Sequence, residues 1–223
     1  MLPLFVLNTI STNMFQSIPP EYDLVWSDEF EVQGIIDSRY WTYEEGFVRN
    51  QELQWYQAEN AFCQQDKLII EARKETTDNP HFQAGSNDWK LNRRRIEYTS
   101  ACITTRNRLS WKYRIFEIRA RIKTQNGLWP AIWFLGQSGE WPSCGEIDLR
   151  EYYQGNILAN ACWGQTARWQ PKWDISKHLI TPFNQTNWDD KFHVWRMEWD
   201  ARKIVLSMDG QALNTINLSD RGT

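Results

Sequence analysis

Strict alternation of apolar and polar residues constrains the fold of this chain more than any other feature. Residues 115–123 alternate most clearly, with an apolar face of Phe116, Ile118, Ala120 and Ile122 and a charged face of Glu117, Arg119, Arg121 and Lys123. Residues 194–199 alternate likewise, with Trp195, Met197 and Trp199 on one side. A period of two residues is typical of a half-buried β-strand, and no stretch of a dozen residues keeps a helical period. The pattern predicts an all-β fold of two packed antiparallel sheets.

Several shorter segments have the same strand-like character. They are Tyr22–Trp26, Lys67–Arg73, Ala101–Thr105, Trp129–Leu135, Glu146–Glu151 and Ile157–Trp163. Residues 203–208 and 211–217 flank the turn pair Asp209-Gly210, which predicts a β-hairpin. Asn126-Gly127 marks another turn. The polar, turn-rich residues 74–92 are expected to form a long surface loop.

Composition and charge exclude several classes of protein. The 223 residues are 41% hydrophobic and 24% charged, which is typical of a soluble globular protein. No apolar run approaches the roughly 18–20 residues of a membrane span. The net charge of −3 gives no electrostatic reason to expect nucleic acid as a partner, and the short basic run Arg93–Arg95 is expected to be a solvated face.

Cysteine and histidine usage argues against a zinc site, because there is no C-x-x-C pair and the three His residues are widely separated. Two disulfides and four buried thiols fit Cys63, Cys102, Cys144 and Cys162 equally well. The 14 Trp residues are more than a core of this size needs. Because the C–H faces of sugar rings stack on aromatic side chains, this excess suggests a carbohydrate-binding cleft.

Three carboxylates in the segment 146–151 carry the strongest functional signal. Glu146 and Asp148 are two residues apart and share one face of a strand, whereas Glu151 falls on the opposite face of a regular strand. A one-residue β-bulge at Leu149-Arg150 would bring Glu151 back to the side of the other two.

Such a trio suits glycoside hydrolysis. A retaining glycosidase needs two carboxyl groups about 5–5.5 Å apart, one as nucleophile and one as acid/base. A third carboxylate between them can set their protonation states, because crowded like charges separate the pKa values of the groups. The spacing E-x-D-x-x-E alone also fits a solvated strand face, but the nearby residues Trp129, Trp133, Trp141 and Trp163 argue against that interpretation.

These motifs together closely resemble glycoside hydrolase family 16, most of all its laminarinase-like endo-β-1,3-glucanases. The resemblance rests on Trp129-Pro-Ala-Ile-Trp-Phe-Leu-Gly136 and Trp141-Pro-Ser-Cys-Gly-Glu-Ile-Asp-Leu-Arg-Glu151. It extends to Trp26–Phe30, Asn50–Tyr56, Tyr98–Ser100, Phe192–Trp199 and the Asp209-Gly210 hairpin. It covers about residues 22–220 and implies a concanavalin A-like β-jelly-roll sandwich with a concave, substrate-binding sheet.

The resemblance also implies roles for individual residues. Glu146 matches the nucleophile, Asp148 the assisting carboxylate and Glu151 the general acid/base. Trp129, Trp133 and Trp141 match aromatic residues of the sugar subsites, although Trp133 or Trp141 could instead be core. Further substrate-binding candidates are Asn50, Arg95 and Trp163, of which Arg95 could equally be solvated. Trp55 and Tyr56 are as compatible with packing as with binding.

The chain departs from the family pattern in three places. Position 150 is Arg where relatives often have Met, and a cation there could perturb the carboxylates if it points inward. Residues 157–163 lack the His that many laminarinases carry, so the resemblance leaves the glucan linkage open. The sequence stops at Thr223, before at least two expected strands, so the catalytic domain, residues 22–223, is expected to be truncated. A structural calcium site that relatives build partly from those strands would be incomplete.

The expected function is retaining endo-hydrolysis of β-1,3 or mixed β-1,3/1,4 glucan, with the polysaccharide as partner and no required cofactor. The same chemistry on an algal galactan and a non-catalytic β-glucan-binding fragment are the alternatives. We expect a monomer without nucleic-acid or membrane partners. Residues 1–21 are expected to be an N-terminal extension or a signal remnant, and the protein to be secreted or periplasmic, because polymeric glucans do not cross membranes.

Overall fold

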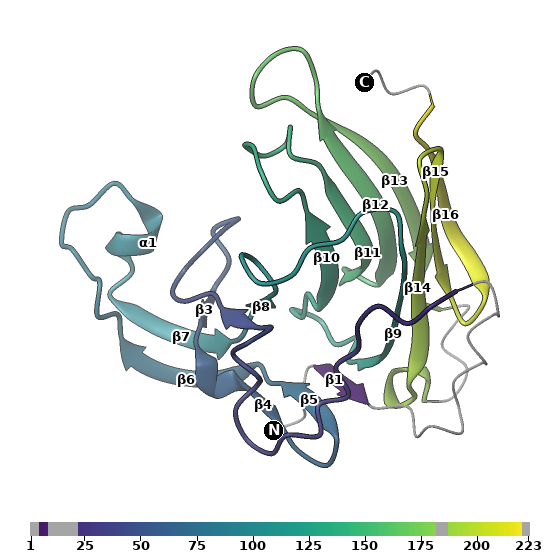
Figure 1. The fold of residues 1–223 in the computed structure, drawn as a ribbon. Coiled ribbons are helices and arrows are strands. Elements are labelled where there is room, and N and C mark those ends of the chain that lie inside the picture. Colours follow the sequence, from purple (N-terminus) through teal and green to yellow (C-terminus); the bar gives the residue numbers. More distant parts are fainter. Residues whose placement is uncertain (1–4, 9–21, 182–186, 220–223) are drawn as a thin grey trace. The chain divides into compact units, whose positions relative to one another are not determined.

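The computed structural model describes residues 5–8, 22–181 and 187–219 (Figure 1). β-Strands dominate these residues, and the one α-helix among them, α1 (Trp89–Asn92), has four residues. This confirms the predicted all-β class. No helix in the described part of the chain is long and apolar enough to cross a membrane. The chain divides into two compact units, Met1–Leu109 and Ser110–Thr223, which are described separately below.

The first unit contains small sheets. β1 (Phe5–Asn8), β5 (Lys67–Ile70) and β4 (Ala61–Cys63) pair antiparallel in that order. A second sheet consists of β2 (Thr42–Tyr43) and β8 (Ile103–Thr104), and a third of β3 (Gln54–Tyr56), β7 (Arg95–Ser100) and β6 (Arg73–Asp78). The β3–β7 pair is parallel, which differs from the all-antiparallel prediction. A 3₁₀ turn, η1 (Ala58–Asn60), precedes β4.

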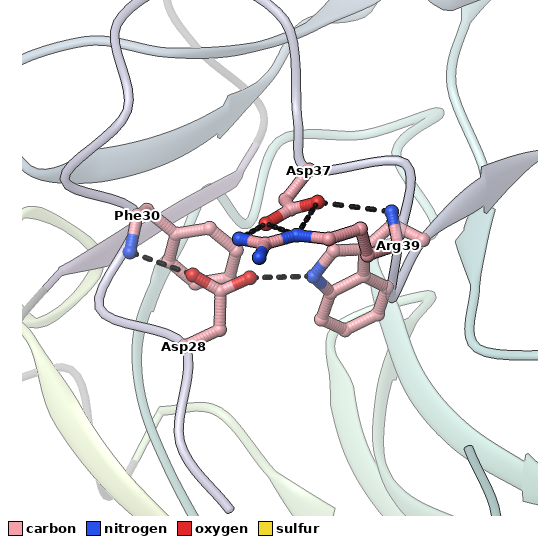
Figure 2. A network of polar contacts seen from close by, with 5 residues as sticks. Asp28, Phe30, Asp37 and Arg39 are labelled. Carbon is pink, nitrogen blue, oxygen red and sulfur yellow. Dashed lines mark hydrogen bonds and ion pairs between the residues drawn. The ribbon is translucent and has the colours of Figure 1, made fainter. Parts of the chain in front are cut away.

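The segment around Asp28 is held by side-chain hydrogen bonds rather than by a strand ladder (Figure 2). Asp28 accepts the Phe30 backbone N–H at 2.9 Å and the Trp41 indole N–H at 2.7 Å. Nearby, the Asp37 carboxylate accepts the Arg39 backbone N–H and its guanidinium. The predicted strand at Tyr22–Trp26 was wrong, because these residues form no strand ladder within the described part of the chain, and the local polar contacts begin only at Asp28.

The predicted surface loop at 74–92 is only partly a loop. Its first residues belong to β6 and its last to α1. The buried Asn79 side chain donates to the carbonyls of Lys90 and Arg93, at 3.1 and 2.8 Å, and closes the segment on itself. Arg93 is also not a solvated cation, since its guanidinium lies 4.9 Å from the ring centroids of both Phe47 and Trp89.

The second unit is a two-layered β-sandwich (Figure 1). One layer has the strand order β16 (Gln211–Asn217), β15 (Lys203–Met208), β14 (His193–Trp199) and β9 (Ile115–Ile122). The other has the order β10 (Ala131–Leu135), β11 (Glu146–Tyr153), β12 (Asn156–Gly164) and β13 (Pro171–Leu179). The 3₁₀ turn η2 (Trp188–Asp190) precedes β14. All strand pairs within these layers are antiparallel.

The predicted alternation holds in this unit. Trp195 and Met197 of β14 are completely buried, and Ala120 and Ile122 of β9 are buried beside them. The hairpin of β15 and β16 is also confirmed. Met208 pairs with Gln211 across Asp209 and Gly210, whose φ angles of 49° and 80° are those that a two-residue type I′ turn requires.

Strand β13 was missed because its apolar pattern is inverted. The residues whose partners on β12 face the core are polar: Asp174 pairs with Ala161, and Ser176 with Ala159. These polar side chains bond to β16, where Asp174 accepts the Asn214 amide and Ser176 donates to the Leu213 carbonyl. The apolar side chains Trp173, Ile175 and Leu179 point the other way and are exposed.

Candidate active site

The predicted bulge in β11 is present, and the pairing of β11 with each of its two neighbouring strands shows it. Along β12, Asp148 pairs with Asn160 and Glu151 with Leu158, so three steps on β11 match two on β12. Along β10, Trp133 pairs with Asp148 and Ile132 with Arg150, so the extra residue appears on that side too. Because the side-chain direction alternates along a strand, one extra residue returns Glu151 to the face of Glu146 and Asp148.

The three carboxylates differ in their exposure. Glu146 and Glu151 are partly exposed, whereas Asp148 between them is 2% exposed. Leu149 and Arg150, the two residues of the bulge, are fully buried on the other side of the strand. The bulge therefore divides the segment into a row of acids on one face and a core-facing pair.

Each glutamate accepts a hydrogen bond from a tryptophan of the predicted set. The indole N–H of Trp141 donates to Glu146 at 2.6 Å, and that of Trp129 donates to Glu151 at 2.8 Å. Both indoles are 40% exposed, and the ring of Trp129 also packs on Tyr153 with 4.5 Å between the centroids. The sequence predicted that these tryptophans lie near the carboxylates, but it did not predict that their indole N–H groups bond directly to the two glutamates.

The loop between β10 and β11 carries Trp141 and is tightly packed at both ends. A Cβ atom at Gly136 would lie 1.9 Å from the Cys144 carbonyl oxygen, and one at Gly164 would lie 2.9 Å from Cα of Ser143. Glu140 of the same loop accepts two hydrogen bonds of 2.7 Å from Arg168. The close backbone approach thus fixes the loop that delivers Trp141 to Glu146, whereas the ion pair lies at the surface, with the Arg168 side chain 72% and the Glu140 side chain 40% exposed.

Burial and neighbouring charges perturb Asp148. Desolvation, reinforced by the charges of Glu151 and Glu146, raises the pKa of Asp148 to about 8, while a hydrogen bond from the Asn160 amide opposes the shift. That bond is long, at 3.4 Å. Asp148 is therefore protonated at neutral pH, so its carboxyl group has a proton to donate between two partly exposed glutamates.

The raised pKa of Asp148 predicts how stability depends on pH. An unfolded Asp ionises near pH 3.9, whereas folded Asp148 keeps its proton up to about pH 8. Between these values the folded state binds more protons, so the unfolding free energy should fall as pH rises, by at most about 1.4 kcal/mol per pH unit from this group. Asp148→Asn should lack this slope. Chemical denaturation between pH 4 and 9 measures it; parallel curves for the two proteins would contradict the assignment.

The other predicted binding residues do not all lie on the carboxylate face of the sheet. Trp133 is directly opposite Asp148 on β10 and so shares the carboxylate face. Cys162 of β12 pairs with Glu146 and shares its face of the sheet. Trp163 is the next residue along β12, so its side chain lies on the opposite face. Asn50 and Arg95 belong to the first unit. Both are exposed; the Asn50 amide donates to Glu52, and Arg95 pairs with Asp78 at 3.1 Å.

Trp55 and Tyr56, for which the sequence was equally compatible with packing and with substrate binding, also lie in the first unit. Trp55 is buried, 6% exposed, with its ring edge-to-face on Phe47 at 5.3 Å. The Tyr56 hydroxyl lies in a local network with Gln54 and Glu52. Both residues therefore have structural partners within their own unit.

Two residues on the carboxylate face were not singled out from the sequence. Glu146 pairs with Cys162, and Cys162 with Trp173; Asp148 is aligned through Asn160 with Ile175 in the same way. Trp173 is 39% exposed and Ile175 is 55% exposed. At a strand spacing of about 4.8 Å they lie roughly 10 Å from β11. The alternation of apolar and polar residues over 171–179 could have revealed this strand. It was misleading because the polar side of the strand, not the apolar side, faces the core.

All four cysteines are free thiols, and burial raises the pKa of Cys162 to about 12. Within the part of the chain that the structure describes, no group of three or more His, Cys, Asp or Glu side chains could hold a metal ion.

Comparison with known proteins places these features in a family. The model for glycosyl hydrolases family 16 matches residues 49–222. A beta-glucanase of Rhodothermus marinus is 34% identical in an alignment 202 residues long that covers 85% of this chain and 64% of that relative. The chain therefore spans somewhat less than two thirds of that relative's length.

Solved structures agree with this result. The catalytic domain of an endo-1,3-beta-glucanase (laminarinase) from Thermotoga petrophila matches with a TM-score of 0.72 and 30% identity, covering 89% of this chain and 78% of that one. A structure from work on endo-acting O-glycanases of the human gut microbiota that initiate mucin breakdown matches with a TM-score of 0.81 and 29% identity, covering 95% and 74%. The family match spans the bulged strand, its three carboxylates and both glutamate-bound tryptophans, and on this basis the chain belongs to glycosyl hydrolases family 16.

Proposed function

We propose that this chain is a retaining endo-β-glucanase that cleaves β-1,3 or mixed β-1,3/1,4 glucan by double displacement. The observation that carries the proposal is the bulge of β11, which gathers Glu146, Asp148 and Glu151 on one face of the sheet. The beta-glucanase and laminarinase relatives support the substrate class.

In the first step, a carboxylate oxygen of Glu146 attacks the anomeric carbon of the sugar. The bond to the leaving glycosidic oxygen breaks as Glu151 donates its proton to that oxygen. The shortened glucan leaves with a new hydroxyl group, and the other part remains as an ester on Glu146. The Trp141 and Trp129 indoles, which donate to the two glutamates, fix the direction of each carboxyl group.

In the second step, Glu151 is ionised and acts as a base. It takes a proton from a water molecule, whose oxygen attacks the anomeric carbon and breaks the bond to Glu146. Two inversions give net retention. Protonated Asp148 assists by donating a hydrogen bond to the Glu146 carboxylate when that group leaves, which lowers the basicity of the leaving oxygen.

The test is reducing-sugar release from a panel of polymers by the purified chain. We expect hydrolysis of laminarin, of a mixed-linkage glucan, or of both, with oligosaccharides as early products because the cleavage is internal. A folded chain that hydrolyses no β-glucan would contradict the proposal. Binding of laminarin without hydrolysis would favour the alternative of a β-glucan-binding fragment.

A second candidate substrate class follows from the TM-score of 0.81 to the O-glycanase structure. On this alternative the same double displacement would act on a mucin O-glycan, since that structure comes from work on endo-acting O-glycanases that initiate mucin breakdown. Mucin O-glycans and an algal galactan therefore belong in the panel. Activity on either of them, with none on β-glucans, would select a non-glucan substrate while leaving the roles of the carboxylates unchanged.

Strand β13 leads to a prediction about substrate binding. Trp173 presents an exposed ring two strands away from Glu146 on the same face. Trp173→Ala should raise KM for polymeric glucan about ten-fold with kcat nearly unchanged, because a remote sugar contact contributes equally to ground and transition states. Tyr113→Ala, which removes a similarly exposed ring near β9, is the control and should leave KM unchanged. A fall in kcat alone for Trp173→Ala would contradict the assignment.

We also propose that the protein acts outside the cytoplasm, secreted or periplasmic, as a monomer. The argument is chemical, since a polymeric substrate must be met where it occurs. Cell fractionation and light scattering of the purified chain test these two points.

A further inference from the structure

A charged side chain lies in the core directly behind the carboxylate row. Arg150 is completely buried, on the opposite side of β11 from the carboxylate face. Its guanidinium lies 5.0 Å from the ring centroid of Trp195, on β14 of the facing sheet. Arg150 also belongs to the bulge. The register between β11 and β12 shifts between Asp148 and Glu151, and the register between β11 and β10 shifts between Asp148 and Arg150.

The guanidinium connects the bulge to the segment that carries Trp129. Nη1 of Arg150 donates to the Pro130 carbonyl at 3.3 Å, and the Tyr152 backbone N–H donates to the same oxygen at 3.0 Å. Trp129 precedes that carbonyl, and its indole N–H donates to Glu151. One chain of contacts therefore runs from Arg150 through Pro130 and Trp129 to the carboxyl group of Glu151.

We propose that Arg150 is a positioning residue for Glu151: it holds the bulge against the Pro130 carbonyl, and its buried positive charge stabilises the ionised form of Glu151. The proposal rests on the proposed function, in which Glu151 is the acid/base.

The electrostatic part follows from the groups that face Glu151. The acidic neighbours on the same strand are Glu146, whose negative charge opposes the ionisation of Glu151, and Asp148, which keeps its proton at neutral pH and adds no charge. The Coulombic interaction of Arg150 with Glu151 has the opposite sign. The neutral contact is the Trp129 indole, packed on Tyr153. Desolvation lowers the pKa of Arg150 to about 9, which still leaves it protonated at neutral pH.

The test compares Arg150→Met with Arg150→Lys in the full chain. Met fills a similar volume without charge, whereas Lys keeps the charge without the planar fork of donors. Glu151 is titrated by carboxyl-carbon NMR of Glu-labelled protein, with E151Q giving the assignment. We expect its pKa to rise by about one unit in Arg150→Met and to stay within a few tenths of a unit in Arg150→Lys.

A second readout separates positioning from a general loss of packing. Glycosylation of Glu146 by an aryl glycoside with a dinitrophenolate leaving group needs no proton from Glu151. Both Arg150 variants should therefore lose about ten-fold in kcat/KM on polymer but less than two-fold on the aryl substrate. Should Arg150→Met not fold, this ratio in Arg150→Lys still decides the positioning role.

The result that overturns the proposal is an unchanged Glu151 pKa in folded Arg150→Met, or equal losses on both substrates. A purely structural role would lower thermal stability and both activities together. The NMR titration does not depend on turnover, so a wild-type chain that hydrolyses nothing would overturn the proposed function and remain distinguishable from a failure of this inference.

Discussion

Replacement of Glu146 by Gln is expected to lower kcat on β-glucan by at least about 10⁴-fold while substrate binding persists. The amide has nearly the same size, and its oxygen can still accept the indole N–H of Trp141, which donates to Glu146 at 2.6 Å. What the variant lacks is the negative oxygen that forms the glycosyl ester. The measurement is the initial rate of reducing-sugar release, with the Kd for an oligosaccharide obtained by calorimetry.

The control for this substitution is Glu140→Gln. Glu140 lies six residues upstream, in the loop between β10 and β11, and bonds to Arg168 rather than facing the carboxylate row. It should change kcat by less than about two-fold, as expected for a surface ion pair. Turnover by Glu146→Gln within ten-fold of the wild type would contradict the nucleophile assignment.

Replacement of Glu151 by Ala should have a different kinetic signature. Loss of general acid catalysis should lower kcat/KM on polymeric glucan by about 10²–10⁴-fold. The loss should be much smaller on a dinitrophenyl glycoside, whose leaving group departs without protonation. Because the variant also lacks the base of the second step, the glycosyl-enzyme should accumulate and give a burst of dinitrophenolate.

Azide provides the matching rescue of Glu151→Ala. This anion needs no base to attack the anomeric carbon and can enter the space left by the carboxyl group. Added azide should accelerate turnover of the aryl substrate and give the β-glycosyl azide, the retained product. An equal loss on both substrates, with no rescue, would contradict the acid/base role of Glu151.

The bulge was predictable because three acids in an E-x-D-x-x-E spacing share one face only if one extra residue interrupts the strand. The structure has this extra residue on both sides of β11. The hairpin at Asp209-Gly210 was equally predictable, since two consecutive left-handed residues favour this turn pair. In both places a local backbone rule determines the structure.

The errors occur where partners distant in sequence determine the structure. Strand β13 directs Asp174 and Ser176 toward the core, and only their bonds to β16 make this favourable. The segment Tyr22–Trp26 has the composition of a strand, but the contacts of Asp28 with Phe30 and Trp41 order the residues that follow it. Alternation reports burial of one face and cannot identify the polar groups that compensate for an inverted pattern.

The candidate site shows the same limit. Sequence spacing placed Trp129 and Trp141 near the acids, yet their indole N–H bonds to Glu151 and Glu146 depend on how the loops before β10 and β11 fold back. The direction of the Arg150 side chain could not be predicted for a similar reason. Whether a bulge residue faces the acids or the core depends on the local twist, and here it packs on Trp195.

The most direct test of the central claim is covalent trapping of the glycosyl-enzyme. A 2-deoxy-2-fluoro β-glucosyl oligosaccharide with a dinitrophenyl leaving group slows the second step more than the first, so the ester accumulates. Intact-mass measurement followed by peptide mapping should show one added oligosaccharide, attached to Glu146. A chain that hydrolyses β-glucan but carries no label, or carries it on another carboxylate, would contradict a double displacement through Glu146.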